Sequence, residues 1–393
     1  MKDYSFDGSI SLEVLNNYLE RAMTFDSHLA ISSKTNEEMY NQTLRVFKKL
    51  VIKYACRFAC ECLPRANEEA WHPELKRLVD DIHSVDPDVI LEACIFETAS
   101  NHVKTISILP ETYKAFGMEG FGRKFDNEKM MYKNGTGSNM FGQGIHLPDI
   151  TRLETQMFFY QRAVKYIDMG FEALHLGQTS IMTKNDTTNK EWEKLIGMIR
   201  DYAREHARRH YVLINSHYVK FYVDGNKQLN DFITYPLRLR VAAGEVDHEI
   251  TEENPQRAEL MYHMYSAVYK ENIKGVSPSG WETEHYPYLV EYDNWGFNPA
   301  HFNKANSPLW GFDEIGWYAH QPRWYRQKFT KDIVSRIESF NENGHLAIPG
   351  VRVVAMMPKT HEYGDYILFN KEFVSEGFDD EDYALEIFNR HGN

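Results

Sequence analysis

Residues 151–178, TRLETQMFFYQRAVKYIDMGFEALHLGQ, give the strongest indication of the fold. Apolar side chains recur at helical spacing through residues 151–169, and Gly170 ends this helix, because glycine is the usual residue just past a helix C-terminus. The apolar residues 171–178 follow at once and predict a buried strand that ends at Gln178. A helix that leads directly into a buried strand is the repeating unit of a parallel sheet with helices outside it.

The same alternation continues on both sides of this unit. We predict further strands at 50–60, 88–98, 211–217, 230–237, the end of the tract 276–295, and 346–357. Helices are predicted from Ser11 onward and at 36–44, 74–84, 191–209, 256–271, 323–340 and 380–389, with an accessory strand at 366–369. Strands and helices thus alternate seven or eight times along the chain.

This rhythm fits either an open doubly wound sheet or a closed barrel. No GxGxxG or GxxxxGK turn follows any predicted strand, so the nucleotide-binding signature of the open sheet is missing. Polar side chains instead follow several different strands, as in barrels whose site is built from all the loops at one mouth. We therefore predict an α/β protein, a (β/α)8 TIM-like barrel with long loop insertions, 110–150 and 272–312, over its carboxyl-terminal mouth.

Composition limits the domain organisation and the partners. We expect a single barrel domain over residues 1–393, with an N-terminal helical segment 1–48 and a C-terminal extension 359–393. The formal charge of −13 argues against nucleic acid and against an anionic membrane surface. Aromatic residues make up 14% of the chain and suit flat sugar rings as partners.

Cysteine usage and the first residues bear on the compartment. The four cysteines show no disulfide pattern, and three of them lie close together in an apolar stretch, which indicates core packing in a reducing compartment. Residues 1–10 lack a leader pattern, and no apolar run reaches the ~20 residues of a membrane helix. We expect a cytoplasmic protein without a cofactor, with export of a processed form as the alternative.

Residues 286–296, YPYLVEYDNWG, indicate the chemistry. Strand periodicity places Glu291, Asp293 and Trp295 on one face. Buried strands seldom end in two carboxylates, because each desolvated charge costs several kcal/mol unless it is paired. Glycoside cleavage needs two carboxyl groups on either side of the scissile bond. We predict Glu291 and Glu97 as the catalytic pair, with Asp293 as the substitute.

The sequence allows other interpretations of these acids. The strand could simply run into a solvated loop, or one of the acids could bind Arg57 and have a structural role. A divalent metal held by His175, His217, His285 and Asp293 would make the protein a metal-dependent hydrolase or isomerase. No HxH, HExxH or CxxC element supports a metal, so we assign no metal site. A non-catalytic glycan-binding protein is the third alternative.

Hydrogen-bonding and stacking groups near the predicted strand ends are the candidate substrate-binding residues. They are polar or aromatic side chains of the kinds that hold sugar hydroxyls and ring faces. The set comprises Arg57, Gln178, Asn215, His217, Trp281, Glu284, His285, Asn294, Trp295, Trp317 and His320.

Three motifs carry a family resemblance: His-Leu-Gly-Gln at 175–178, the segment 279–295 with its Ser-Gly-Trp and Tyr-Asp-Asn, and Trp-Tyr-Ala-His-Gln at 317–321. In these the chain resembles poorly characterised bacterial (β/α)8-barrel proteins related to glycoside hydrolases, over about residues 11–358. The resemblance implies a barrel that acts on carbohydrate. The best-known barrel glycosidases carry an Asn-Glu pair after strand four, where this chain has Asn215 and Ser216. A proton donor must therefore come from elsewhere, and we predict Glu97.

Overall fold

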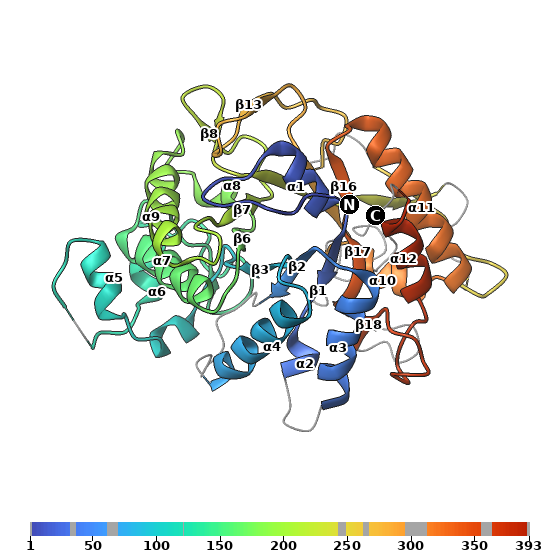
Figure 1. Cartoon of the computed structure of the whole chain (residues 1–393). Coiled ribbons are helices and arrows are strands. Elements are labelled where there is room, and N and C mark those ends of the chain that lie inside the picture. The colour runs from blue at the N-terminus through green and yellow to red at the C-terminus, as the bar shows by residue number, and fades with distance from the viewer. Residues whose placement is uncertain are drawn as a thin grey trace.

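The computed structural model describes residues 2–31, 37–60, 70–120, 122–242, 249–261, 267–294, 313–354 and 364–390. Its central element is a ten-stranded sheet with the order β16-β15-β10-β7-β6-β3-β2-β1-β17-β18. Helices surround the strands (Figure 1). The strands of this sheet are β1 (Ala22–Phe25), β2 (Tyr54–Ala59), β3 (Ile90–Cys94), β6 (Ala173–His175), β7 (Leu213–Ser216), β10 (Phe232–Pro236), β15 (Tyr288–Glu291), β16 (Gly344–Leu346), β17 (Ile348–Val354) and β18 (Gly364–Ile367).

The sheet is parallel from β16 through β17, and only β18 pairs antiparallel, with β17. It is strongly curled. A single residue, Ala347, separates β16 from β17, and its N–H donates to the Val290 carbonyl oxygen at 2.8 Å. β16 pairs with β15, whereas β17 pairs with β1, so one continuous segment contacts strands from both halves of the chain. The protein is thus mixed α/β, as its sequence predicts.

Helices follow most of the parallel strands and cover the outside of the sheet. Ser11 caps α1 by accepting a hydrogen bond from the Val14 N–H at 3.2 Å, as its position predicts. α7 and α9 pack against each other, and α9 turns its apolar side chains inward. The helices are α1 (Leu12–Leu19), α2 (His28–Ile31), α3 (Glu37–Leu50), α4 (His72–Val85), α5 (Pro110–Ala115), α6 (Asn127–Met130), α7 (Leu153–Asp168), α8 (Thr179–Met182), α9 (Lys190–His206), α10 (Glu314–His320), α11 (Arg323–Phe340) and α12 (Glu381–Phe388), with a 3₁₀ helix at Asn101–Thr105.

Small sheets occupy the connections between these elements. The helix predicted at 256–271 is wrong, because Ala258–Leu260 forms β12 and pairs antiparallel with β11 (Leu239–Val241). Pairing with a neighbouring strand outweighs the local pattern there. The other short strands are β4 (Ala99–Ser100), β5 (Ile145–His146), β8 (Tyr222–Val223), β9 (Lys227–Gln228), β13 (Gly275–Val276) and β14 (Glu282–Thr283).

Two apolar clusters hold the fold together. The larger one fills the space between the helices and the sheet. The smaller one gathers residues from α1, from seven of the parallel strands and from Ala347 between β16 and β17, and it includes Tyr54, Phe232 and Leu289. Burial of such side chains contributes about 1.5–3 kcal/mol each. Among the described residues, no helix has the length and apolarity that crossing a bilayer requires.

Candidate active site

A cavity of about 790 Å³ lies at the carboxyl ends of the parallel strands. Its size is typical of a small-molecule site. Six of the side chains predicted from sequence line it, and they come from five different strands or the loops just after them. These are Arg57, Glu97, Gln178, His217, Asp293 and Asn294.

Arg57 is held in an unusual backbone conformation. Its φ of +61° lies in the left-handed region, and the register of β2 against β3 shifts between Ala55 and Ala59. Left-handed backbone costs a residue with a side chain about 1–3 kcal/mol and collects at functional sites. The Arg57 N–H donates to Glu92 Oε1 at 2.9 Å, which fixes this bulge. The bulge aims the guanidinium at Glu291.

Glu291 lies beneath the cavity wall as the partner of Arg57. Arg57 Nε donates to Glu291 Oε2 at 2.9 Å, and Arg57 Nη2 donates to Oε1, so the pair is bidentate. Arg352 Nη1 and His217 Nε2 each lie 3.7 Å from a Glu291 oxygen. The Glu291 side chain is only 1% exposed. The structure therefore places Glu291 in a buried ion-pair cluster next to the cavity.

His217 connects this cluster to the cavity. Its Nδ1 lies 2.8 Å from the Thr234 carbonyl oxygen, which needs a proton on that nitrogen, and Nε2 then accepts from Arg57 Nη2 at 3.2 Å. Burial, together with the charge of Arg57, lowers the pKa of His217. The imidazole is consequently neutral.

A second buried network lies deeper, around Asn215. Its Nδ2 donates to Glu92 Oε2 at 2.7 Å, and its Oδ1 lies 2.6 Å from His175 Nδ1. Asn215 is fully buried and does not line the cavity. Burial raises the pKa of Glu92 to about 7, although Tyr54 and the Arg57 N–H donate to it. Sequence reasoning missed Glu92, whose only sign was a lone acid inside a buried strand.

Asp293 presents a charged carboxylate to the cavity. Its side chain is 22% exposed, and Arg238 Nη1 lies 3.6 Å from Oδ2. Burial raises its pKa, but the charges of Arg238 and Arg57 outweigh burial and hold the pKa well below the ordinary value. Asp293 is therefore ionised at neutral pH.

Glu97 is positioned by the turn after β6. Gln178 donates to it twice, from N–H to Oε2 at 3.0 Å and from Nε2 to Oε1 at 2.9 Å. Gly177 makes this approach possible, because its φ is +63° and a Cβ there would lie 2.1 Å from Glu97 Oε2. Glu97 and Asp293 thus share one cavity.

Five of the predicted binding residues lie elsewhere. Trp281 Nε1 donates to the Ile10 carbonyl oxygen, while Glu284 pairs with Lys274 and His285 with Glu342. These three precede β15 and lie at the amino ends of the strands. The prediction that segment 272–312 covers the carboxyl-terminal mouth is therefore wrong for its first part, which contains these residues. Two others are on α10, where Trp317 is buried in the core and His320 Nδ1 lies 2.7 Å from the Gly316 carbonyl oxygen of the same helix. Trp295 falls outside the described residues.

Several cavity residues were missed by the sequence analysis. Arg238 and Arg352 follow or lie within strands, and their positions alone did not distinguish them from surface arginines. Phe96 precedes Glu97, and Phe141, which belongs to segment 110–150, also lines the cavity. Tyr218 follows His217 directly and completes the aromatic part of the wall.

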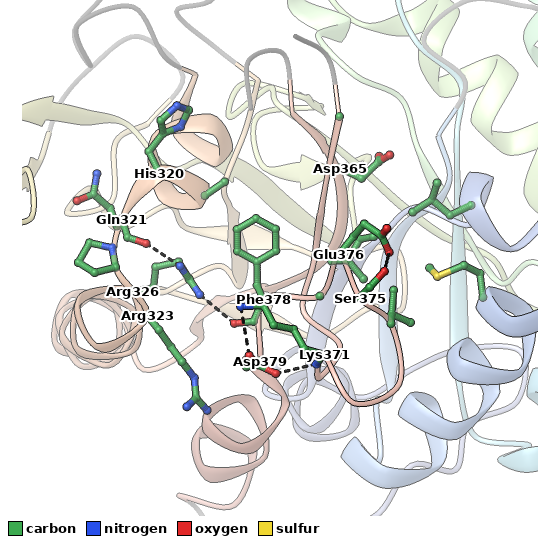
Figure 2. Close-up of a pocket in the computed structure, with 18 of the residues that line it drawn as sticks. His320, Gln321, Arg323, Arg326, Asp365, Lys371, Ser375, Glu376, Phe378 and Asp379 are labelled. Carbon is green, nitrogen blue, oxygen red and sulfur yellow. Dashed lines mark hydrogen bonds and ion pairs between the residues drawn. The ribbon is translucent and has the colours of Figure 1, made fainter. Parts of the chain in front are cut away.

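A second cavity, of about 910 Å³, lies between α10, α11 and the C-terminal part of the chain (Figure 2). Several of its polar groups already have partners. Arg326 donates to Asp380 Oδ2 at 2.8 Å and to two backbone carbonyls, and Lys371 pairs with Asp379 at 3.5 Å. Of the predicted site residues that the structure describes, only His320 lines it.

The residues considered for a metal do not converge. His285 lies at the amino ends of the strands, whereas His217 and Asp293 lie at the carboxyl ends. Within the described part of the chain, no three His, Cys, Asp or Glu side chains are grouped so as to hold an ion.

No protein-family model and no curated protein matches the chain. Solved structures that resemble it include a debranching enzyme from Nostoc punctiforme, with 11% identity over 58% of this chain and 50% of that chain and a TM-score of 0.32. The same enzyme soaked with acarbose matches 95% of this chain and 80% of its own at 10% identity and a TM-score of 0.40. A GH27 β-L-arabinopyranosidase from Geobacillus stearothermophilus, in complex with arabinose, matches at 9% identity over 51% of this chain and 49% of that chain, with a TM-score of 0.27. The chain spans about half the length of the first and third of these. TM-scores below 0.5 do not establish a common fold, so the proposals below rest on the geometry of this chain.

Proposed function

We propose that the chain is a single-domain (β/α)8 barrel that acts on carbohydrate as a glycoside hydrolase. The argument for closure is the segment 344–354, which pairs with β15 through β16 and with β1 through β17. Eight parallel strand positions in chain order then form a ring, and each contributes a side chain to the inner apolar cluster. Layered inward side chains of this kind fill the interior of (β/α)8 barrels.

The observation that carries the proposed reaction is the shared cavity of Asp293 and Glu97. Asp293 is ionised and opens into the cavity, so we assign it as the nucleophile, or as the base that activates water. Glu97 is the remaining carboxyl group in the described wall, and we assign it as the proton donor to the leaving oxygen.

Glu291 then has a different role from the one that its sequence position favours. Its carboxylate is bound in a bidentate pair by Arg57 and does not line the cavity. We assign it as a positioning residue that fixes Arg57 and, through His217, the wall of the site. Phe96, Phe141 and Tyr218 supply flat apolar faces for a sugar ring.

One observation favours the second candidate, a glycan-binding protein without turnover. Gln178 donates a hydrogen bond to each carboxylate oxygen of Glu97, so both oxygens already have a partner in the protein and are less free to reach a leaving oxygen. Without that contact Glu97 transfers no proton, and a binding site alone remains.

The test is release of reducing sugar from a panel of oligosaccharides by the wild-type chain and by Asp293→Asn and Glu97→Gln. The proposal expects turnover by the wild type and a loss of at least ~10²-fold in each variant, because each removes a group that acts on a proton or on the reacting carbon. Sugar binding without turnover by the wild type would favour the second candidate. Full activity of Asp293→Asn would contradict the assignment.

A further inference from the structure

The cavity wall carries charge of the opposite sign to the rest of the chain. The whole chain has a formal charge of −13. Among the described residues that line the cavity, the cationic side chains outnumber the carboxylates of Glu97 and Asp293. The cations are Arg57, Lys220, Arg238 and Arg352.

Some of this positive charge is balanced from behind. Arg57 is paired with Glu291, and Arg238 Nη1 donates to Glu314 Oε1 at 3.1 Å. Burial raises the pKa of Glu314 well above its ordinary value, so that carboxyl group adds little negative charge. The site therefore keeps a cationic excess.

Arg352 is a buried cation with one donor nitrogen that has no hydrogen-bond acceptor among the described residues. It lies on β17, is 4% exposed and lines the cavity. Its Nη2 donates to Asn294 Oδ1 at 2.9 Å. Its Nη1 has no hydrogen-bond partner in the described part of the chain, and Glu291 Oε2, at 3.7 Å, is too distant to accept. A buried charged donor without an acceptor is costly, and an anionic ligand oxygen would satisfy it.

We propose that this cavity recognises a sugar unit that bears a carboxylate, a uronic acid, and that Arg352 binds the carboxylate. The inference rests on the proposed carbohydrate function and names its substrate class. A planar guanidinium suits a planar carboxylate, which it can bind through two parallel hydrogen bonds. The sugar carboxylate then completes the donors of Arg352, while Asp293 and Glu97 stand by the ring and its linkage.

The experiment measures calorimetric binding of glucuronate and galacturonate oligosaccharides against their neutral glucose and galactose counterparts, at fixed ionic strength. Wild-type protein should bind the acidic sugars roughly tenfold to a hundredfold more tightly, as expected for one charge-assisted hydrogen-bonded contact. Arg352→Met should lose this preference and keep its affinity for the neutral sugars. Arg240→Met is the matched control, because Arg240 is 63% exposed and pairs with Glu259 on β12.

Each outcome decides a different point. Equal wild-type binding of acidic and neutral sugars would overturn this inference and leave the proposed function standing. Binding of neither class would overturn both. If folded Arg352→Met still prefers the acidic sugars to the same degree, the role of Arg352 is overturned. Arg352→Lys keeps the charge without the planar guanidinium and gives a second variant if the first does not fold. Preference for sulfated over carboxylated sugars would also count against a uronic acid.

Discussion

The buried pair between Arg57 and Glu291 yields the sharpest prediction about stability. Glu291→Gln keeps the shape of the side chain and removes its charge, so the Arg57 guanidinium, 6% exposed, loses its only bidentate anion. Breaking a buried ion pair from one side costs about 3–5 kcal/mol, because an uncompensated charge remains. We expect this loss of unfolding free energy in denaturant titrations followed by circular dichroism at pH 7.

The double variant Arg57→Met with Glu291→Leu removes both charges. It should lose much less than the sum of the losses of Arg57→Met alone and Glu291→Leu alone, since the coupling in this double-mutant cycle reports the pair itself. Glu284→Gln is the control: its partner is Lys274, their side chains are 71% and 53% exposed, and the expected change is within about 0.5 kcal/mol. If Glu291→Gln is as stable as Glu284→Gln, the pair does not support the site and the reasoning fails.

Three further predictions concern Glu92, Gly177 and Trp281. Burial raises the folded-state pKa of Glu92 from 4.5 to about 7. The contribution of Glu92 to the free energy of unfolding is therefore complete below pH 4.5 and is lost as the pH rises through 7. Glu92→Gln should remove up to about 3 kcal/mol of this decrease in unfolding free energy between pH 4.5 and pH 8, as measured in denaturant titrations. Gly177→Ala should lower the free energy of unfolding and also displace Glu97, so sugar turnover should fall. Gly117→Ala is the control, because Gly117 also has a positive φ, +65°, but has open space around it. This control should lower the free energy of unfolding by about 1–2 kcal/mol and leave sugar turnover unchanged. Trp281→Phe should lower the melting temperature without changing turnover, and a change in turnover would show that the amino ends of the strands take part in the site.

The alternation of helices and strands was predictable because long amphipathic helices carry a strong periodic signal. α7, α9 and α11 lie within a few residues of their expected positions. β1 was missed, since its four residues are too few to show a period. Segment 344–354 pairs with both β15 and β1 because the sheet is curled, and the local sequence does not encode this curl.

The candidate site was predictable where a polar residue lies within three residues after the end of a strand. Glu97, Gln178 and Asp293 follow this rule, and the structure brings them together. The rule does not show which carboxylate an arginine will bind. Arg57 binds Glu291 from a bulge in which Arg57 itself has a left-handed backbone conformation. The sequence gives no sign of this conformation.

Aromatic residues were the weakest guide. Trp281 and Trp317 were predicted to stack on a sugar. Trp281 instead donates to the Ile10 carbonyl oxygen near the amino ends of the strands, and Trp317 is buried in the core. Large apolar rings stabilise a core as readily as they bind a sugar, and only their place in the fold separates the two uses.

The most direct test of the central claim is a crystal structure of the folded Asp293→Asn variant with an oligosaccharide bound. The account predicts a sugar in the 790 Å³ cavity, with the anomeric carbon beside residue 293 and the linkage oxygen within hydrogen-bond distance of Glu97. A sugar bound only in the cavity between α10, α11 and the C-terminal part of the chain, or a ring in which neither carboxyl position approaches a glycosidic bond, would contradict it.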